Sequence, residues 1–182
     1  MGFFNNLFRN NKKQIGNNKK QNNKLSDLLI DYSLKFNNAI LSSYDTSQID
    51  QTYLNNLKLE SYAFTYQVID RLLYETFDHK KEKYMNLIDA NTSQSFLDRI
   101  NYDTSQTEFS RLINERQYEY SQFEFITNEM TNTIYWHFGS KITPKTLSQE
   151  NVMSLVTSIP SLTEVNLELM KDLPPALPEN PL

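Results

Sequence analysis

Histidine is the side chain most often used for acid–base chemistry near neutral pH, and this sequence contains only two. His79 lies in the charged run Asp-His-Lys-Lys-Glu at 78–82, which is typical of a solvated helix junction. His137 lies between Trp136 and Phe138, and these neighbours favour a half-buried position with one hydrogen bond. We therefore interpret both histidines as structural residues and expect neither to be catalytic.

Other residues with catalytic or metal-binding chemistry are absent or lack a motif. The chain has no cysteine, which excludes disulfides, thiolate nucleophiles and cysteine-based zinc sites. It has no Glu-x-x-His pair, the motif of di-iron helical bundles. Its three glycines, Gly2, Gly16 and Gly139, form no phosphate-binding loop or nucleophile elbow. The sequence predicts a protein that is not an enzyme, with no catalytic, cofactor or metal site.

The net charge of −4 conceals a strong asymmetry along the chain. Residues 1–24 carry six basic and no acidic side chains, whereas residues 25–182 carry 12 basic and 22 acidic ones. An acidic body argues against binding to nucleic acid, whose affinity depends on phosphate neutralisation. No segment reaches the roughly 18 apolar residues needed to span a bilayer, and no signal peptide is recognisable. The expected location is the cytoplasm, including the inner membrane surface, or a phage particle.

Apolar residues recur at helical spacing along most of the chain, which predicts an all-α fold. We expect a first helix over residues 25–44. A second, long helix is predicted to begin at a capping box of Ser47 and Asp50 and to run to about Phe77. A third helical segment is expected over residues 80–101. Within it, Asn91-Thr92-Ser93 either interrupts the helix with a turn or caps a new one.

The fourth predicted helix begins at a capping box of Ser105 and Glu108 and continues to Gly139, where a glycine can end it. Aromatic residues alternate within 118–125, as in a strand, but the phase of the alternation breaks midway. A continuous strand would keep a period of two, so we favour a helix there. These segments predict a bundle of four main helices over residues 25–139.

All six prolines lie in the C-terminal part of the chain. We expect two short helices within residues 140–172, separated by Pro160. Residues 173–182 are predicted to form an extended, polyproline II tail. In that tail, Pro175 and Pro178 have a spacing that aromatic grooves recognise, and an arm packed along an adjacent subunit is an equal alternative.

The sequence contains an internal repetition. The turn Tyr-Asp-Thr-Ser-Gln occurs at residues 44–48 and again at 102–106, and the same offset of 58 residues relates two copies of Leu-Ile-Asp. This predicts that residues 25–79 and 83–137 are duplicated helical hairpins. The alternative is that Thr-Ser-Gln is a convenient helix cap that the chain uses twice.

Tyrosine and phenylalanine are abundant, with 11 of each. Helical residues two apart point in nearly opposite directions, so Tyr62 and Phe64 cannot share one face of a helix. In one interpretation, the tyrosines lie partly exposed with their hydroxyls in water, or the C-terminal helices cover the surplus aromatic residues. In the second, these residues bind other proteins, because tyrosine and phenylalanine are enriched at interfaces. In the second case, Tyr118, Phe125 and Trp136 are candidate contacts.

Residues 1–24 are predicted to be a flexible basic segment with a short amphipathic tip. The tip contains Phe3, Phe4, Leu7 and Phe8, which are candidate contacts with a membrane or a partner. An apolar tip followed by lysines suits weak contact with an anionic membrane surface. Docking to another protein and an inert leader are the alternatives.

The sequence therefore favours a non-enzymatic structural or adaptor protein. We expect it to assemble with itself or with other proteins through aromatic helix faces and flexible terminal arms, as a component of a bacterial or phage assembly does. The first alternative is a peripheral membrane-associated helical protein anchored by its basic N-terminal segment. The second is a small enzyme or ligand-binding bundle.

Overall fold

The computed structural model describes residues 18–42, 50–88, 90–125, 128–142 and 149–178. Within these ranges the chain forms seven α-helices and two short 3-10 helices, with no strand beyond an isolated bridge between Glu124 and Thr133. This confirms the all-α fold class. The candidate contacts Phe3, Phe4, Leu7 and Phe8 lie outside the described residues.

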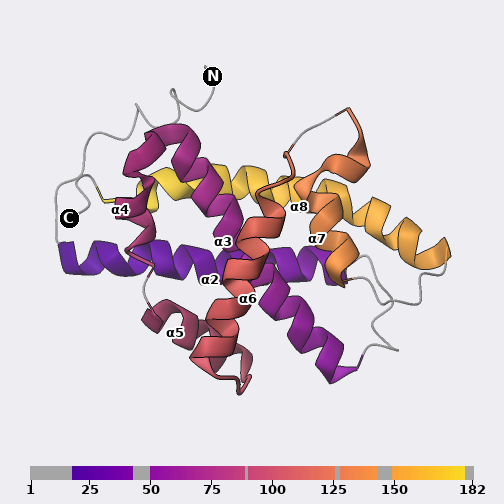
Figure 1. Ribbon diagram of the computed structural model, residues 1–182, viewed down its shortest axis with the longest axis horizontal. Helices are drawn as coiled ribbons and strands as arrows, with labels where there is room; N and C mark the ends of the chain where they lie inside the picture. Colours follow the sequence, from indigo (N-terminus) through magenta and orange to yellow (C-terminus); the bar gives the residue numbers. More distant parts are fainter. Residues whose placement is uncertain (1–17, 43–49, 89, 126–127, 143–148, 179–182) are drawn as a thin grey trace.

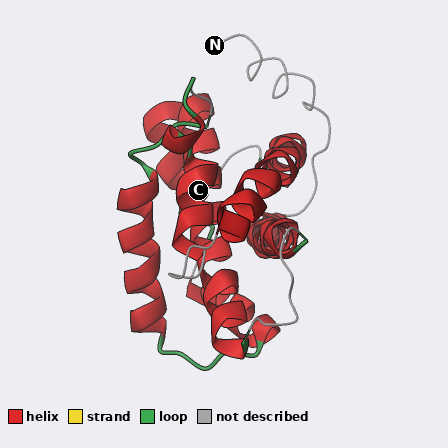
Figure 2. Cartoon of the chain, turned by 90° about the vertical axis from the view of Figure 1, so that its right-hand side faces the viewer, coloured by secondary structure: helices red, strands yellow, loops and turns green. Residues whose placement is uncertain are grey.

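The helices are arranged in layers around a central helix. Helix α2 (Asn18–Leu41) and helix α8 (Gln149–Ala176) run side by side along the horizontal of Figure 1, and they are seen nearly end-on in Figure 2. Helix α3 (Gln51–Phe77) crosses them and packs against α2, while α6 (Gln106–Tyr120) covers α3 from the opposite side. Helix α3 is thus packed between other helices.

Two polar contacts fix the relative direction of α2 and α8. The Tyr32 hydroxyl donates to the Asp172 carboxylate at 2.6 Å, and Lys35 Nζ donates to Glu168 at 2.8 Å. Because residue numbers rise along α2 as they fall along α8, the two helices are antiparallel. Burial raises the pKa of Tyr32 well above its ordinary value, and the hydrogen bond to Asp172 raises it further.

The centre of α3 is buried all round. The seven consecutive residues 59–65 are buried, which is nearly two helical turns, so no side of this segment faces solvent. Tyr62 packs against the rings of Phe96 and Phe109, with centroids 4.6 and 5.1 Å away. Internal packing therefore accommodates aromatic residues on both sides of α3.

Phe64 faces the other neighbours of α3. Its ring stacks on Phe138 with centroids 4.4 Å apart, and it makes edge contacts with Phe36 at 4.9 Å and Tyr120 at 5.6 Å. Burial of such a ring contributes about 1.5–3 kcal/mol, and well-oriented ring pairs add to this. Phe64 therefore links α2, α6 and the helix that carries Phe138.

The first predicted helix begins earlier in the structure. Helix α2 starts at Asn18, seven residues ahead of the predicted start at Leu25, so it overlaps the segment 1–24 predicted to be flexible. Residues 18–24 contain three lysines and one glutamine, which have good helix propensity and can extend a helix anchored by the buried Leu25 and Leu29. Residues 1–17 lie outside the described part of the chain.

The second predicted helix ends at Phe77 as expected and differs from the structure only at its start, whereas the third is divided into two helices. Asp50 caps α3 by accepting a hydrogen bond from the Tyr53 N–H at 2.7 Å, and Ser47 is outside the described residues. The third segment follows the 3-10 helix η2 (Asp78–Lys80) and is divided into α4 (Lys81–Met85) and α5 (Ala90–Ile100). The interruption thus precedes Asn91-Thr92-Ser93, which lie inside α5.

The fourth predicted helix is correct at its start and wrong at its end. Ser105 caps α6 by accepting from the Glu108 N–H at 3.2 Å, but α6 ends at Tyr120. After the 3-10 helix η3 (Met130–Asn132), helix α7 (Ile134–Ile142) follows, with Gly139 buried in its interior. The helix preferred for residues 118–125 is therefore present only as far as Tyr120.

The prolines of α8 do not interrupt it. Pro160 was expected to separate two helices and residues 173–182 to be extended, yet α8 continues through Pro160, Pro174 and Pro175. A proline in a helix costs about 3 kcal/mol, but the apolar stripe of α8 continues beyond each of them and its burial offsets this cost. The buried residues of this stripe are Leu162, Leu169, Leu173 and Ala176.

The structure does not confirm the duplication. Helices α2 and α3 have 24 and 27 residues, whereas their counterparts α5 and α6 have 11 and 15. The second copy of the repeated turn leads into α6, and the first copy lies largely in residues 43–49, outside the described part of the chain. A shared capping sequence accounts for the second copy.

Candidate functional site

The candidate contact residues of the folded part lie on separate elements. Tyr118, near the end of α6, is 74% exposed. Phe125 is half-buried, with the guanidinium of Arg71 5.2 Å from its ring centroid, and Trp136 is half-buried in α7. At the C-terminal end, Pro175 is exposed in α8 and Pro178 is buried. These five residues therefore belong to α6, the segment that follows it, α7, and the end of α8 with the residues just beyond it.

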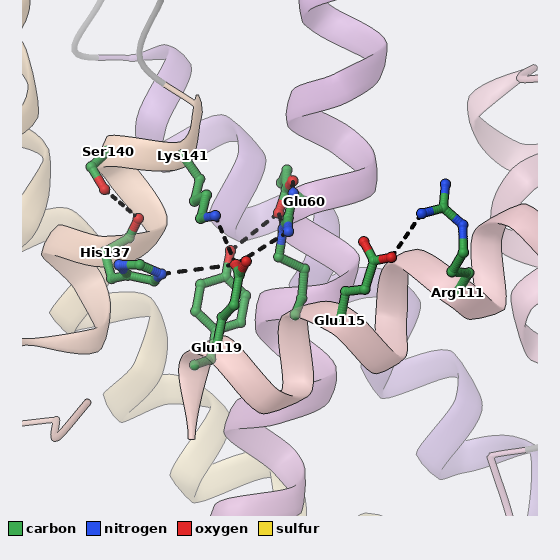
Figure 3. Close-up of polar contacts among 9 residues, drawn as sticks. Glu60, Arg111, Glu115, Glu119, His137, Ser140 and Lys141 are labelled. Atoms are coloured by element: carbon green, nitrogen blue, oxygen red, sulfur yellow. Dashed lines mark hydrogen bonds and ion pairs between the residues drawn. The ribbon is translucent and has the colours of Figure 1, made fainter. Parts of the chain in front are cut away.

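The densest group of ionisable side chains was not predicted from the sequence. It lies where α3, α6 and α7 meet and consists of Glu60, Arg116, Glu119, His137 and Lys141, which we call the charge cluster. Figure 3 shows Lys141 and His137 of α7 directed toward Glu119 of α6, with Glu60 of α3 behind them. The cluster joins three helices that are distant in the sequence.

Arg116 and Glu60 form the innermost ion pair of the charge cluster. Arg116 Nε lies 2.8 Å from both carboxylate oxygens of Glu60, and Nη2 lies 2.6 Å from Oε1. The side chains are only 17% and 11% exposed. Hydrogen bonding to Glu60 raises the pKa of Arg116 above its ordinary value, against the effect of burial. Such a bidentate contact has both the strength and the geometry of a specific helix–helix link.

Tyr120 completes the coordination of Glu60. Its buried hydroxyl donates to Glu60 Oε2 at 3.2 Å, so this carboxylate receives hydrogen bonds from two residues of α6. Burial raises the pKa of Tyr120 well above its ordinary value, and the charge of Glu60 raises it further. The hydroxyl therefore remains a hydrogen-bond donor throughout the neutral range.

Glu119 connects α6 to α7. Its Oε2 lies 2.8 Å from Lys141 Nζ, 3.2 Å from Arg116 Nη1 and 4.0 Å from His137 Nε2. Burial alone would raise the pKa of Glu119, but the hydrogen bond from Lys141 and the charges of Arg116 and Lys141 lower it below its ordinary value. Glu119 is therefore ionised at neutral pH, and it holds two cations.

His137 is half-buried, as the sequence predicted, and its ring stacks on Phe123 with centroids 4.1 Å apart. The expected side-chain hydrogen bond is not found at Nε2, which is buried without a hydrogen-bond partner among the described residues. Burial and the nearby charge of Lys141 lower the pKa of His137, while Glu119 opposes this. His79, in contrast, is 80% exposed beside Asp78, which confirms its solvated position.

Arg71 of α3 fixes the chain where α6 ends. Its guanidinium donates to the carbonyl oxygens of Tyr120 at 3.2 Å and Ser121 at 3.1 Å, and also to that of Phe123. The last carbonyls of a helix have no partner within the helix, and a cation favours that end of the helix dipole. Arg71 thus stabilises the turn that follows Tyr120 and explains why α6 does not continue to Gly139.

These interactions are those of a structural link between helices. The carboxylates are engaged by arginine, lysine and tyrosine side chains. Ser140 donates to the backbone carbonyl of His137 at 2.8 Å, and none of the described hydrogen bonds joins a serine hydroxyl to the His137 ring. One signal in the sequence pointed to this cluster. Glu60 stands among the apolar residues Leu57, Leu59 and Tyr62, and a carboxylate buried there requires a partner.

Two searches of the described residues give negative results. No three histidine, cysteine, aspartate or glutamate side chains in this part of the chain come together as metal ligands. Among the same residues, no helix combines the length and the apolar character needed to cross a membrane. No family model, curated protein or solved structure matches the chain.

Proposed function

We propose that this protein is a non-enzymatic structural or adaptor module that assembles with itself or with other proteins. The observation that carries the proposal is Tyr118, whose side chain is 74% exposed on the outer side of α6. Exposure of the large apolar ring of a tyrosine to water is unfavourable. Burying the ring against a partner gains free energy at a low cost in side-chain entropy.

The arrangement of α6 supports this role. Its inner side is fixed by Phe109, Ile113 and Tyr120, which are buried, and by the ion pair between Arg116 and Glu60. Tyr118 therefore projects from a rigid helix and not from a loop. A rigid aromatic anchor is what a protein interface uses most effectively, because little order has to be imposed on binding.

Light scattering coupled to size exclusion tests the proposal on the full chain, the variant Tyr118→Ala and the control Asn114→Ala. Asn114 is also exposed on α6, one turn earlier, so the control is a second exposed residue of the same helix. We expect a discrete oligomer for the full chain and for Asn114→Ala, and a lower mass for Tyr118→Ala. A full chain that is monomeric, or equal masses for all three proteins, would contradict assembly with itself through Tyr118.

The basic segment of residues 1–24 supports a second function, peripheral attachment to an anionic membrane. Flotation with vesicles containing phosphatidylserine tests it on the full chain and on a variant lacking residues 1–17, which keeps all of α2. Binding that is lost in the shortened variant and at high salt would favour this function. Absence of binding by the full chain would exclude it for such membranes.

A further inference from the structure

His137 is the only titratable ring in the charge cluster, and its surroundings offer its Nε2 little room for a proton. Nε2 is buried without a hydrogen-bond partner among the described residues, 4.0 Å from Glu119 Oε2. One face of the ring stacks on Phe123, and Tyr120 makes an edge contact with centroids 5.7 Å apart. Among the described residues, no acceptor lies within hydrogen-bonding distance of a proton on Nε2.

The charges around this ring are already balanced. Helix α3 contributes Glu60, helix α6 contributes Arg116, Glu119 and the neutral Tyr120, and helix α7 contributes Lys141. Two carboxylates thus face two permanent cations while His137 is neutral. A proton on His137 adds a third positive charge beside Arg116 and Lys141, and Glu119 already binds both of these cations.

We propose that α7 packs against α6 through a neutral His137, and that a proton on this ring weakens the packing of α7 in mildly acidic solution. This inference does not depend on assembly or on membrane binding. The effect is a loosening and not a release, because Ile134 and Phe138 of α7 remain buried and Phe138 stacks on Phe64.

The same geometry allows one opposite outcome, in which the proton strengthens the packing of α7. A protonated Nε2 that moved from 4.0 Å to hydrogen-bonding distance of Glu119 would form an ion pair, which would tighten α7 instead. Our proposal holds that Lys141, at 2.8 Å from the same oxygen, blocks this approach. The two outcomes change stability in opposite directions, so a measurement can separate them.

The chain offers a natural probe and a matched control. Trp136 is the only tryptophan and is adjacent to His137 in α7, so its fluorescence reports on the packing of this helix. The only other histidine, His79, is exposed at the junction between α3 and α4. The variants His137→Phe, which keeps an aromatic ring without a charge, and His79→Gln can therefore be compared with the natural sequence.

The experiment follows Trp136 emission and the urea midpoint of the full chain from about pH 8 to about pH 5, where histidine titrates. We expect a change in emission and a falling midpoint in the natural sequence and in His79→Gln, both absent or strongly reduced in His137→Phe. A response that persists in His137→Phe, no response in the natural sequence, or a rising midpoint would overturn the proposal.

A direct titration keeps the proposal testable if His137→Phe does not fold. The ring protons of two histidines are resolved by NMR, and His79→Gln assigns them. We expect the midpoint of His137 to lie below about 6.5, the ordinary value for histidine. A His137 midpoint at or above that value would show that the charge cluster accepts the proton, and the proposal would be wrong.

Discussion

The charge cluster predicts that two arginines on the same helix differ greatly in their contribution to stability. Arg116 and Arg111 both lie in α6 and both pair with a glutamate. Arg116 and Glu60 are 17% and 11% exposed, whereas Arg111 and Glu115 are 70% and 48% exposed. Replacing each arginine by leucine removes one charge with little change in helix propensity. The comparison therefore contrasts a buried cation, which binds Glu60 and Glu119, with an exposed cation that binds only Glu115 among the described residues.

The expected magnitudes follow from that burial. Removing one partner of a buried ion pair costs about 3–5 kcal/mol, because the other charge is left without compensation. In Arg116→Leu the Tyr120 hydroxyl still donates to Glu60, so we expect a loss of about 3 kcal/mol in the free energy of unfolding. An exposed i, i+4 pair contributes about 0.3–0.5 kcal/mol, so Arg111→Leu should lie near that value.

Equilibrium urea unfolding, followed by circular dichroism, measures both changes. For a chain of this size, about 1 kcal/mol corresponds to a shift of roughly 2–4 °C in Tm, so thermal unfolding should separate the variants as well. Arg111→Leu is the matched control, because it carries the same substitution five residues earlier on the same helix. The difference between the variants should therefore exceed about 2 kcal/mol.

The double variant Glu60→Met, Arg116→Leu tests the cause of the loss. Replacing a whole buried pair by apolar residues of similar size is often neutral, so this variant should recover part of the stability lost in Arg116→Leu. The recovery is incomplete because the buried Tyr120 hydroxyl loses its acceptor when Glu60 is replaced. Equal losses in Arg116→Leu and Arg111→Leu would refute the reasoning. A double variant no more stable than Arg116→Leu alone would show that the uncompensated charge of Glu60 is not the cause of the loss.

Three further predictions concern other parts of the fold. Phe64→Ala should cost about 3–5 kcal/mol in urea unfolding, because its ring is fully buried between three helices, while Phe64→Leu should cost less. Asp78→Gly should stabilise the chain by about 1 kcal/mol, measured as a rise in Tm, because Asp78 has φ 51° and ψ −130°, a conformation that strains a residue with a Cβ. Burial raises the pKa of Tyr135 to about 12, so its contribution to stability is complete below about pH 10 and is lost as the pH rises toward 12. Tyr135→Phe should therefore make the urea midpoint less dependent on pH in that window, and an unchanged dependence would contradict the buried position of the hydroxyl.

The sequence predicts the helices well because periodicity and capping are local properties. The heptad-like apolar spacing of α2 identified Leu25, Leu29 and Phe36, all of which are fully buried. The cap at Ser105 was also correct, since it depends only on residues within one turn. Local patterns in the sequence are therefore sufficient to predict the all-α fold class.

The errors arise where distant residues decide the conformation. Helix α6 ends at Tyr120 because Arg71 of α3 binds the carbonyls that follow, and nothing near Tyr120 in the sequence reveals this. Helix α8 passes through Pro160 because Leu162 and Leu169 beyond it find a buried surface. In both cases tertiary contacts outweigh a local preference. The charge cluster was missed for the same reason, since its members come from three helices.

The aromatic surplus, which suggested an interface, separates into two groups once the packing is known. Tyr62 and Phe64 are covered by other helices of the same chain, so they are not evidence for a partner protein. Replacing them would unfold the core, and a loss of assembly in such variants would say nothing about an interface. Tyr118 is different because it is exposed on a helix whose inner side is firmly packed, so we expect Tyr118→Ala to leave the fold intact. The case for an assembly role therefore depends on Tyr118, and substitutions there test it without the confounding effect of unfolding.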